Sequence, residues 1–225
     1  MKGSYPNQRQ RGFNLLELFI VLMILTVLAF LFFPAIAHGN KAPAGRIQCV
    51  NNLKQTGLAL RVWEGDHGDK YPMSVPGTNG GTLEFTRGLN AWRHFQVASN
   101  ELSTPKILIC PLESPRLRKA ATNFIAFNNS NLSYFVGVNA TEENPQTILS
   151  GDRHFTNGTP IQNGMLELTT NQLAGWTEAL HKRVGNILLS DGSVQQVSIS
   201  GLRTAIQNAA DEHGKIRLQM PVVDP

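Results

Sequence analysis

A single carboxylate, Glu17, lies at the entrance of a long apolar stretch. From Leu18 to Phe33 the only polar side chain is Thr26. Thirteen Leu, Ile, Val or Phe residues in this stretch favour membrane insertion by about −6 kcal/mol, whereas an acid costs about +3 kcal/mol at the centre of a spanning helix and less near its end. Insertion is therefore favoured with Glu17 present, and an ionisable residue in such a position is by default a candidate for function.

The apolar stretch permits two ordinary interpretations. In the first it is a plain signal anchor, which keeps Lys2, Arg9 and Arg11 inside and sends the chain after Phe33 outward. In the second it is a secretory signal, cut at the small-x-small pattern that ends with Ala37. The stretch is longer than the roughly 7–15 apolar residues of such signals and carries an acid, so the second interpretation is the weaker one.

The segment "RGFNLLEL", residues 11–18, resembles the processing site of type IV prepilins and type II secretion pseudopilins. The resemblance implies that a prepilin peptidase cuts on the cytoplasmic side between Gly12 and Phe13, methylates the new amine and leaves the apolar helix in place. Glu17 then stands for the family's glutamate. Pro34 resembles the proline at which many pilins bend their first helix.

This resemblance gives Glu17 a chemical role. The amine freed at Phe13 is a cation in a low-dielectric setting, and a nearby carboxylate offsets its desolvation. If that amine belongs to a neighbouring subunit, the pair sets the register of a helical filament. We therefore expect a single-pass inner-membrane protein with a cytoplasmic N-terminus, a periplasmic or extracellular C-terminal domain and other pilin-like subunits as partners.

The two cysteines, Cys49 and Cys110, fall in the part expected to face outward, where an oxidising compartment permits a disulfide. Closing a loop of about 60 residues is worth about 4 kcal/mol in the chain-entropy model. Two buried free thiols are the alternative, since free cysteine is among the most buried residue types. We predict the bridge, as a staple between helix and sheet.

His181 and Asp191-Gly192 stand in the spacing H-x9-DG. Asp-Gly is typical of a tight turn, and a neutral His181 one strand's length earlier can bond a backbone carbonyl. A metal site is the alternative, with Asp152 as a third ligand. Calcium then fits better than zinc because the available ligands are mainly oxygens.

The H-x9-DG spacing also resembles a C-terminal signature of bacterial prepilin-type proteins. The segment "CVNNLKQTGLAL" and the pair Cys110-Pro111 resemble the same family. The resemblance thus covers most of the chain, but it supplies no task for His181 or the Asp191-Gly192 pair. A further metal candidate, the loop with Asp66, His67 and Asp69, is more typical of a solvated turn.

The pattern divides the chain into a leader at 1–12, a transmembrane helix at 13–37, a linker and amphipathic continuation of that helix at 38–64, and an extracytoplasmic domain at 65–225. Poor helix formers predict a break between residues 38 and 45. The apolar stripe of the amphipathic part comprises Ile47, Val50, Leu53, Gly57 and Leu60.

In the domain, residues 90–102 predict a helix, and 105–111, 132–138 and 147–155 predict strands. Residues 185–199 predict a hairpin with a bulge in its second strand. A last helix should start at a Ser200 cap and bury Leu202, Ala205, Ile206 and Ala209. The fold class is therefore α+β, with a long N-terminal hydrophobic helix packed on a small antiparallel sheet.

Charge and motifs exclude several functions. The net charge is +4, but the leader carries three basic residues, so the rest has 17 basic against 16 acidic residues and no basic patch for nucleic acid. Nucleophile-base, P-loop and HExxH motifs are missing from the sequence, which predicts a non-enzyme without a cofactor. A secreted or membrane-anchored binding module, or a metal-dependent enzyme using His181 and Asp191, is the alternative.

Overall fold

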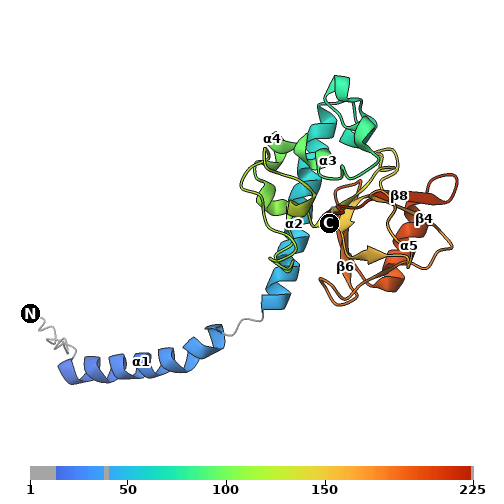
Figure 1. Cartoon of the computed structure of the whole chain (residues 1–225). Coiled ribbons are helices and arrows are strands. Elements are labelled where there is room, and N and C mark those ends of the chain that lie inside the picture. Colours follow the sequence, from blue (N-terminus) through green and yellow to red (C-terminus); the bar gives the residue numbers. More distant parts are fainter. Residues whose placement is uncertain (1–13, 38–40, 224–225) are drawn as a thin grey trace, which may run out of the picture. The chain divides into compact units, whose positions relative to one another are not determined.

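The computed structural model describes residues 14–37 and 41–223, and the chain divides into two compact units after Lys41 (Figure 1). The predicted cleavage between Gly12 and Phe13 lies outside the described residues. The predicted α+β class with an antiparallel sheet is confirmed.

The described residues of the first unit form the helix α1 (Leu15–Ala37). Glu17 lies in its first turn, where the helix dipole favours a negative charge. The Thr26 hydroxyl donates to the carbonyl of Met23 at 2.8 Å, so this polar group is satisfied within its own helix. Within the described residues, no helix has both the length and the apolarity of a membrane span.

α2 (Lys41–Gly65) follows, and it starts within the range 38–45 in which a break was predicted. Residues 38–40 lie outside the described range, but Pro43 and Gly45 are helical. Pro43 is tolerated because the N–H groups of a first helical turn have no intrahelical acceptor. Glycine fits at position 45 because there is little room for a side chain: a Cβ there would lie 2.6 Å from Cδ2 of Leu112.

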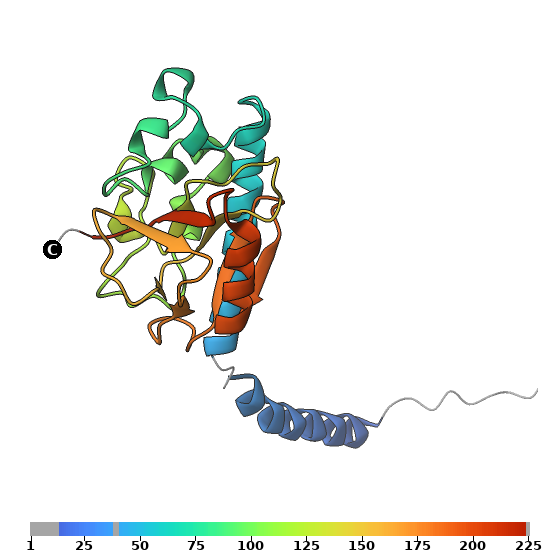
Figure 2. The same ribbon diagram turned by 90° about the vertical axis from the view of Figure 1, so that its right-hand side faces the viewer.

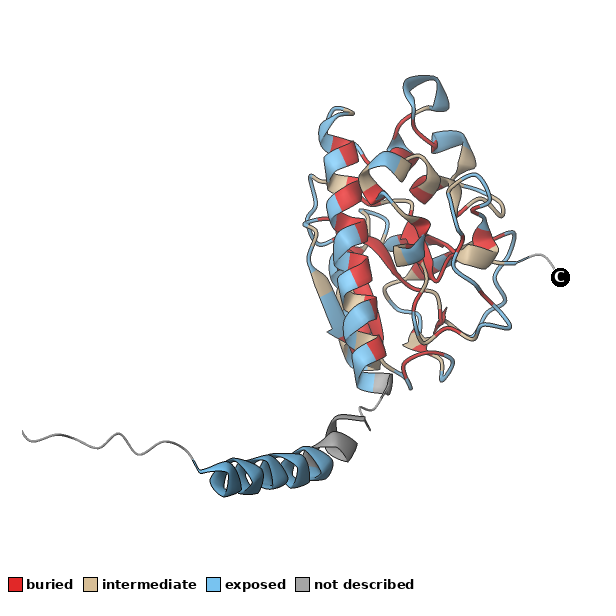
Figure 3. Cartoon of the chain, turned by 90° about the vertical axis from the view of Figure 1, so that its left-hand side faces the viewer, coloured by how far each residue is buried: buried red, intermediate tan, exposed pale blue. Residues whose placement is uncertain are grey.

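One face of α2 is buried along nearly its whole length (Figure 3). Cys49, Leu53, Leu60 and Trp63 form this face, each at most 3% exposed. The predicted stripe was wrong at Ile47, which is 63% exposed. Cys49, two residues later, is buried instead. The buried face of α2 therefore includes small and polar residues as well as apolar ones.

The chain between the end of α2 and the first strand consists of loops and short helical turns. No described residue from 66 to 133 belongs to a strand. The predicted helix at 90–102 is two short helices, α3 (Arg93–Gln96) and α4 (Ser99–Leu102). The other turns are the 3₁₀ elements η1 (Pro72–Ser74), η2 (Gly77–Asn79), η3 (Leu83–Phe85), η4 (Pro105–Leu108) and η5 (Asn129–Asn131).

The strand predicted at 105–111 was wrong, because η4 occupies its first half. Pro105 stands at the start of η4, where its fixed φ suits a helical turn. Leu108 is fully buried and its carbonyl accepts from Ser133 N at 2.9 Å. The apolar run is therefore a buried turn beneath the sheet.

A six-stranded antiparallel sheet forms the centre of the second unit, in the order β4-β8-β1-β2-β6-β7 (Figure 2). The strands are β1 (Tyr134–Gly137), β2 (Ile148–Asp152), β4 (Met165–Thr169), β6 (Gly185–Leu189), β7 (Val194–Val197) and β8 (Lys215–Gln219). A separate two-stranded sheet pairs β3 (Phe155–Thr156) with β5 (Gly175–Trp176). The predicted strands at 132–138 and 147–155 are confirmed.

The large sheet separates two hydrophobic cores. Successive side chains of a strand point to opposite faces. On β6, Leu188 joins the core beneath α2, whereas Ile187 joins the core that includes α5 (Ile199–Ala209). On β1, Val136 and Phe135 divide in the same way. The sheet is thus covered on both faces, not packed on a single helix.

The predicted hairpin is formed by β6 and β7, but its predicted bulge was wrong. Their pairing is regular from Gly185↔Val197 to Leu188↔Val194. The register shift lies instead where β2 meets β6, between Ile148 and Ser150. α5 is capped by Ser198 and not by Ser200, and it buries Leu202, Ile206 and Ala209 as expected.

Candidate functional site

The H-x9-DG residues lie at opposite ends of β6. His181 precedes the strand, and Asp191-Gly192 form the turn that follows it. Lys182 and Arg183, directly after His181, both have positive φ values, 54° and 65°. Two consecutive left-handed residues of this kind are costly and redirect the chain sharply. This turn fixes His181 against the sheet before β6 begins.

The His181 side chain is fully buried beside a sulfur atom and a carboxylate. Its Nε2 lies 3.6 Å from Sγ of Cys110 and 3.4 Å from Oδ2 of Asp152. Arg46 of α2 donates to the His181 carbonyl at 3.2 Å, which ties the segment before β6 to the helix. The sequence-predicted partners His181 and Asp152 are thus brought together, whereas Asp191 is not.

Burial governs the charge of both groups. It lowers the pKa of His181 to about 4, with the Arg46 guanidinium adding to the effect, so the imidazole is neutral. Burial raises the pKa of Asp152 to about 7, against the two hydrogen bonds that Asn186 donates to Oδ2 from its backbone and side chain. No described donor reaches the other oxygen, Oδ1. The hydrogen bonds of Asp152 therefore do not fully compensate for the cost of burying its negative charge.

Cys49 of α2 and Cys110, just after η4, are joined by a disulfide, with Cα atoms 5.3 Å apart. Both are buried, at 0% and 1% exposure. The bridge lies against His181 and connects α2 to the turn that passes under the sheet. Among the described residues, Cys49, Cys110 and His181 form the group whose ligand atoms lie close enough to share a metal ion.

His154, between β2 and β3, extends this cluster and was missed from the sequence. Its ring lies 5.4 Å from that of His181, centroid to centroid, and 5.1 Å from that of Trp176. Its Nε2 donates to the carbonyl of Val184 at 3.1 Å. The carbonyl bond predicted for His181 is therefore made by His154 instead. The sequence feature that could have identified His154 is its position two residues after Asp152, in the same buried stretch.

A buried ion pair closes the side of the cluster. Arg153 donates from Nε to Glu113 Oε2 at 3.0 Å and pairs with it again through Nη2. The Ser133 hydroxyl also donates to Glu113, at 3.0 Å. These contacts satisfy Glu113, so the pair positions β1 and β2, and within this cluster Asp152 is the carboxylate with an unpartnered oxygen.

The Asp191-Gly192 turn has a sufficient local cause. Gly192 has φ 83° and donates its N–H to the carbonyl of Leu189 at 3.0 Å. Oδ1 of Asp191 accepts from the N–H of Ser193 at 2.8 Å, and the residue is exposed. The preceding Ser190 carbonyl accepts from the Tyr71 hydroxyl at 2.7 Å and from Arg61 at 2.8 Å. The turn thus holds the hairpin against α2 and η1.

The loop acids predicted as a weaker metal candidate do not converge. His67 stacks on Trp63 with ring centroids 3.6 Å apart, and its Nδ1 lies 2.7 Å from the Trp63 carbonyl. Asp69 has φ 57°, a value that acids tolerate in turns. The loop is explained by the stacking of His67 and by its turn geometry.

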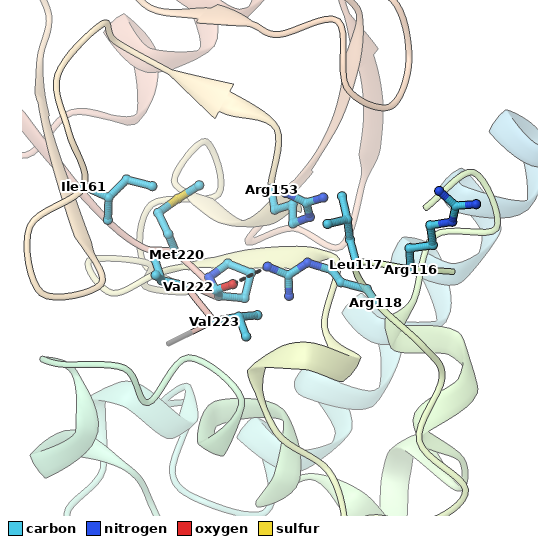
Figure 4. Close-up of a pocket in the computed structure, with 9 residues that line it drawn as sticks. Arg116, Leu117, Arg118, Arg153, Ile161, Met220, Val222 and Val223 are labelled. Atoms are coloured by element: carbon cyan, nitrogen blue, oxygen red, sulfur yellow. Dashed lines mark hydrogen bonds between the residues drawn. The ribbon is translucent and has the colours of Figure 1, made fainter. Parts of the chain in front are cut away.

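A cavity of about 460 Å³ opens beside the end of β8 (Figure 4). Two of its three arginines are engaged: Arg118 donates to the carbonyls of Asn129, Leu132 and Pro221, and Arg153 is paired as described above. Arg118 therefore fastens the C-terminal segment to the domain. The remaining lining is mostly apolar: Leu117, Ile161, Met220, Val222 and Val223.

Comparison with known proteins gives one partial likeness. Over 70 residues the chain is 43% identical to the type II secretion system core protein G of Klebsiella pneumoniae, a match that covers 31% of this chain and 49% of the relative. Over 69 residues it is 41% identical to the protein of the same name from Pectobacterium carotovorum subsp. carotovorum, covering 31% and 43%. The chain spans about half the length of the curated relatives it matches. No protein-family profile and no solved structure matches it.

Proposed function

We propose that the chain is a pilin-like subunit, a pseudopilin, of a type II secretion or type IV pilus-like machine. The observation that carries the proposal is the partial likeness to type II secretion system core protein G at about 40% identity. The prepilin-type segment "RGFNLLEL" also supports it.

In this proposal the protein acts by assembly and not by catalysis. The apolar helix anchors the subunit in the inner membrane, and the domain after it lies in the periplasm or outside the cell. Glu17 pairs with the Phe13 amine of a neighbouring subunit. The buried His181 and Asp152 are out of reach of a substrate, which supports a structural task for the domain.

Mass spectrometry of the N-terminus of the purified protein tests the proposal. A chain that begins with N-methyl-Phe13 supports it. A chain that begins at His38 indicates an ordinary secretory signal, and one that begins at Met1 a plain anchor. Either of these would refute prepilin processing.

A matched variant sharpens the test. The peptidase needs a small residue before the cut, so Gly12→Val should leave a membrane-bound precursor 12 residues longer than the mature form. Gly3→Val changes the same residue type within the leader, away from the cut, and should mature normally. Normal maturation of Gly12→Val would contradict the proposal.

A further inference from the structure

Three side chains of the kind that binds soft metal ions converge at the disulfide. The two sulfur atoms of Cys49 and Cys110 and a ring nitrogen of His181 all lie within 4.8 Å of one another, and all three residues are buried. A carboxylate oxygen, Oδ2 of Asp152, lies 3.4 Å from Nε2 of the same His181. Asp152 lies outside the group of three, so its carboxylate would have to move toward the sulfurs to become a fourth ligand. Thiolate sulfur, imidazole nitrogen and carboxylate oxygen are all donors that zinc accepts.

The surroundings of the cluster also favour a cation. Asp152 is fully buried, and the hydrogen-bond donors it meets belong to the neutral Asn186. Its Oδ1 finds no partner among the described residues. A buried carboxylate that faces neutral groups is unfavourable, and a divalent cation beside it would remove that penalty.

We propose that Cys49 and Cys110, when reduced, bind one Zn²⁺ together with His181 and Asp152. The domain then has two alternative staples at one place, a disulfide or a zinc ion. The neutral His181 would bind through Nε2 and keep its proton on Nδ1, as a metal-bound imidazole must.

The disulfide must be reduced before the metal can bind. A trialkylphosphine reductant transfers two electrons to the S–S bond, takes an oxygen atom from water and becomes the phosphine oxide, while the two protons of that water give two thiols. Zn²⁺ then displaces both thiol protons and binds two thiolates. The two sulfurs must move apart to about 3.8 Å, the separation in a tetrahedral site with Zn–S bonds of about 2.3 Å.

The test uses the full chain in detergent micelles. The protein is unfolded, reduced with the phosphine and refolded without oxygen in the presence of Co²⁺, which reports thiolate ligands by a charge-transfer band in the near ultraviolet. One Co²⁺ per chain, with that band and the intense visible bands of tetrahedral cobalt, is expected, and Zn²⁺ should displace it. The disulfide-bonded protein should bind none.

Variants assign the ligands. His181→Ala should weaken metal binding about a hundredfold or more, and Asp152→Asn about tenfold. Asp191→Asn, in the exposed turn, and His213→Ala, at an exposed histidine, should bind as the wild type does. If His181→Ala fails to refold, His181→Cys should refold with metal and show a stronger thiolate band.

Several results would overturn the proposal. They are reduced wild type without bound metal, cobalt bound without the thiolate band, uptake by the disulfide-bonded form, and unchanged affinity of His181→Ala. Refolded His181→Cys that takes up no metal would also overturn it.

Discussion

Gly57 of α2 lies directly against Leu188 of β6. A Cβ at Gly57 would stand 2.6 Å from Cδ1 of Leu188, well inside van der Waals contact. Leu188 is fully buried in the core beneath α2. The approach of helix and sheet at this point therefore depends on the missing side chain.

Gly57→Ala should destabilise the domain by about 1–3 kcal/mol, although alanine favours a helix, because overpacking outweighs propensity in a filled core. Urea denaturation of purified protein measures the change. Gly65→Ala, at the end of the same helix with nothing within 4 Å of its added Cβ, is the control and should be neutral or slightly stabilising. Adding Leu188→Val should recover part of the loss, and independent effects of the two changes would contradict the proposed contact.

The disulfide gives a second prediction. Mass spectrometry without reductant should find the peptides of Cys49 and Cys110 linked. Cys49→Ser combined with Cys110→Ser should lower the free energy of unfolding by about 4 kcal/mol, since the bridge closes a loop with a sequence separation of 61. Two freely alkylated thiols in protein isolated without reductant would refute the bridge.

The buried His94 should make the free energy of unfolding depend on pH. Burial lowers its pKa to about 4, and it is 1% exposed between Thr82 and Gln219, whose side chains lie 2.6 Å from its two ring nitrogens. From about pH 6.5 down to about pH 4 the unfolded chain binds a proton that the folded chain does not, so stability is lost as pH falls through this window.

The pKa values of His154 and His181 are also lowered, so these residues make stability fall with pH in the same direction as His94. Asp152, whose pKa is raised to about 7, acts against them, because the folded chain binds its proton first. We therefore compare wild type with His94→Gln. Their difference in unfolding free energy should change by about 3 kcal/mol between pH 7 and pH 4, in favour of the variant at low pH. A constant difference across this range would show that His94 is not held neutral.

The hairpin turn gives a prediction about Gly192. Its φ of 83° is costly for a residue with a Cβ, so Gly192→Ala should destabilise the domain by about 1–2 kcal/mol. Gly192→Asn should lose less, because asparagine tolerates left-handed backbone. Equal stability of all three proteins in urea would contradict the turn geometry.

Glu17→Leu tests assembly within the proposed function. The variant should insert and be cleaved normally, since insertion does not depend on the acid, yet it should fail to enter filaments. Crosslinking to neighbouring subunits measures incorporation. Thr26→Leu removes the other polar group of the stretch, whose hydroxyl is satisfied within α1, and should assemble normally. Undiminished incorporation of Glu17→Leu would count against the pairing with Phe13.

Local signals in the sequence predicted several elements correctly. The aromatic and β-branched residues in 132–138 predicted β1, the Asp191-Gly192 pair predicted the β6–β7 hairpin, and the 3.6-residue period predicted the buried face of α5. These features depend on neighbours within a few residues. Asp152, named as the distant third ligand of the alternative metal site, does lie beside His181.

The errors came from contacts between distant segments. The run at 105–111 has strand propensity, but nothing pairs with it and Pro105 starts a turn instead. Ile47 lies on the exposed side of α2 because Cys49 is drawn inward by Cys110. His154 and Arg46 acquire their roles at His181 from separations of 27 and 135 residues, which no periodic pattern reveals.

The order of the chain has a consequence for how the protein matures. Cys49 and Cys110 both precede Tyr134, where the first described strand begins, whereas Asp152 and His181 arrive with the sheet. If the chain is exported as in the proposed function, the two thiols would be open to an oxidase before the sheet forms. Once the sheet has closed over them, their burial shuts that enzyme out. Under the zinc proposal, the order of oxidation and sheet formation would therefore determine whether a molecule encloses the disulfide or the reduced pair.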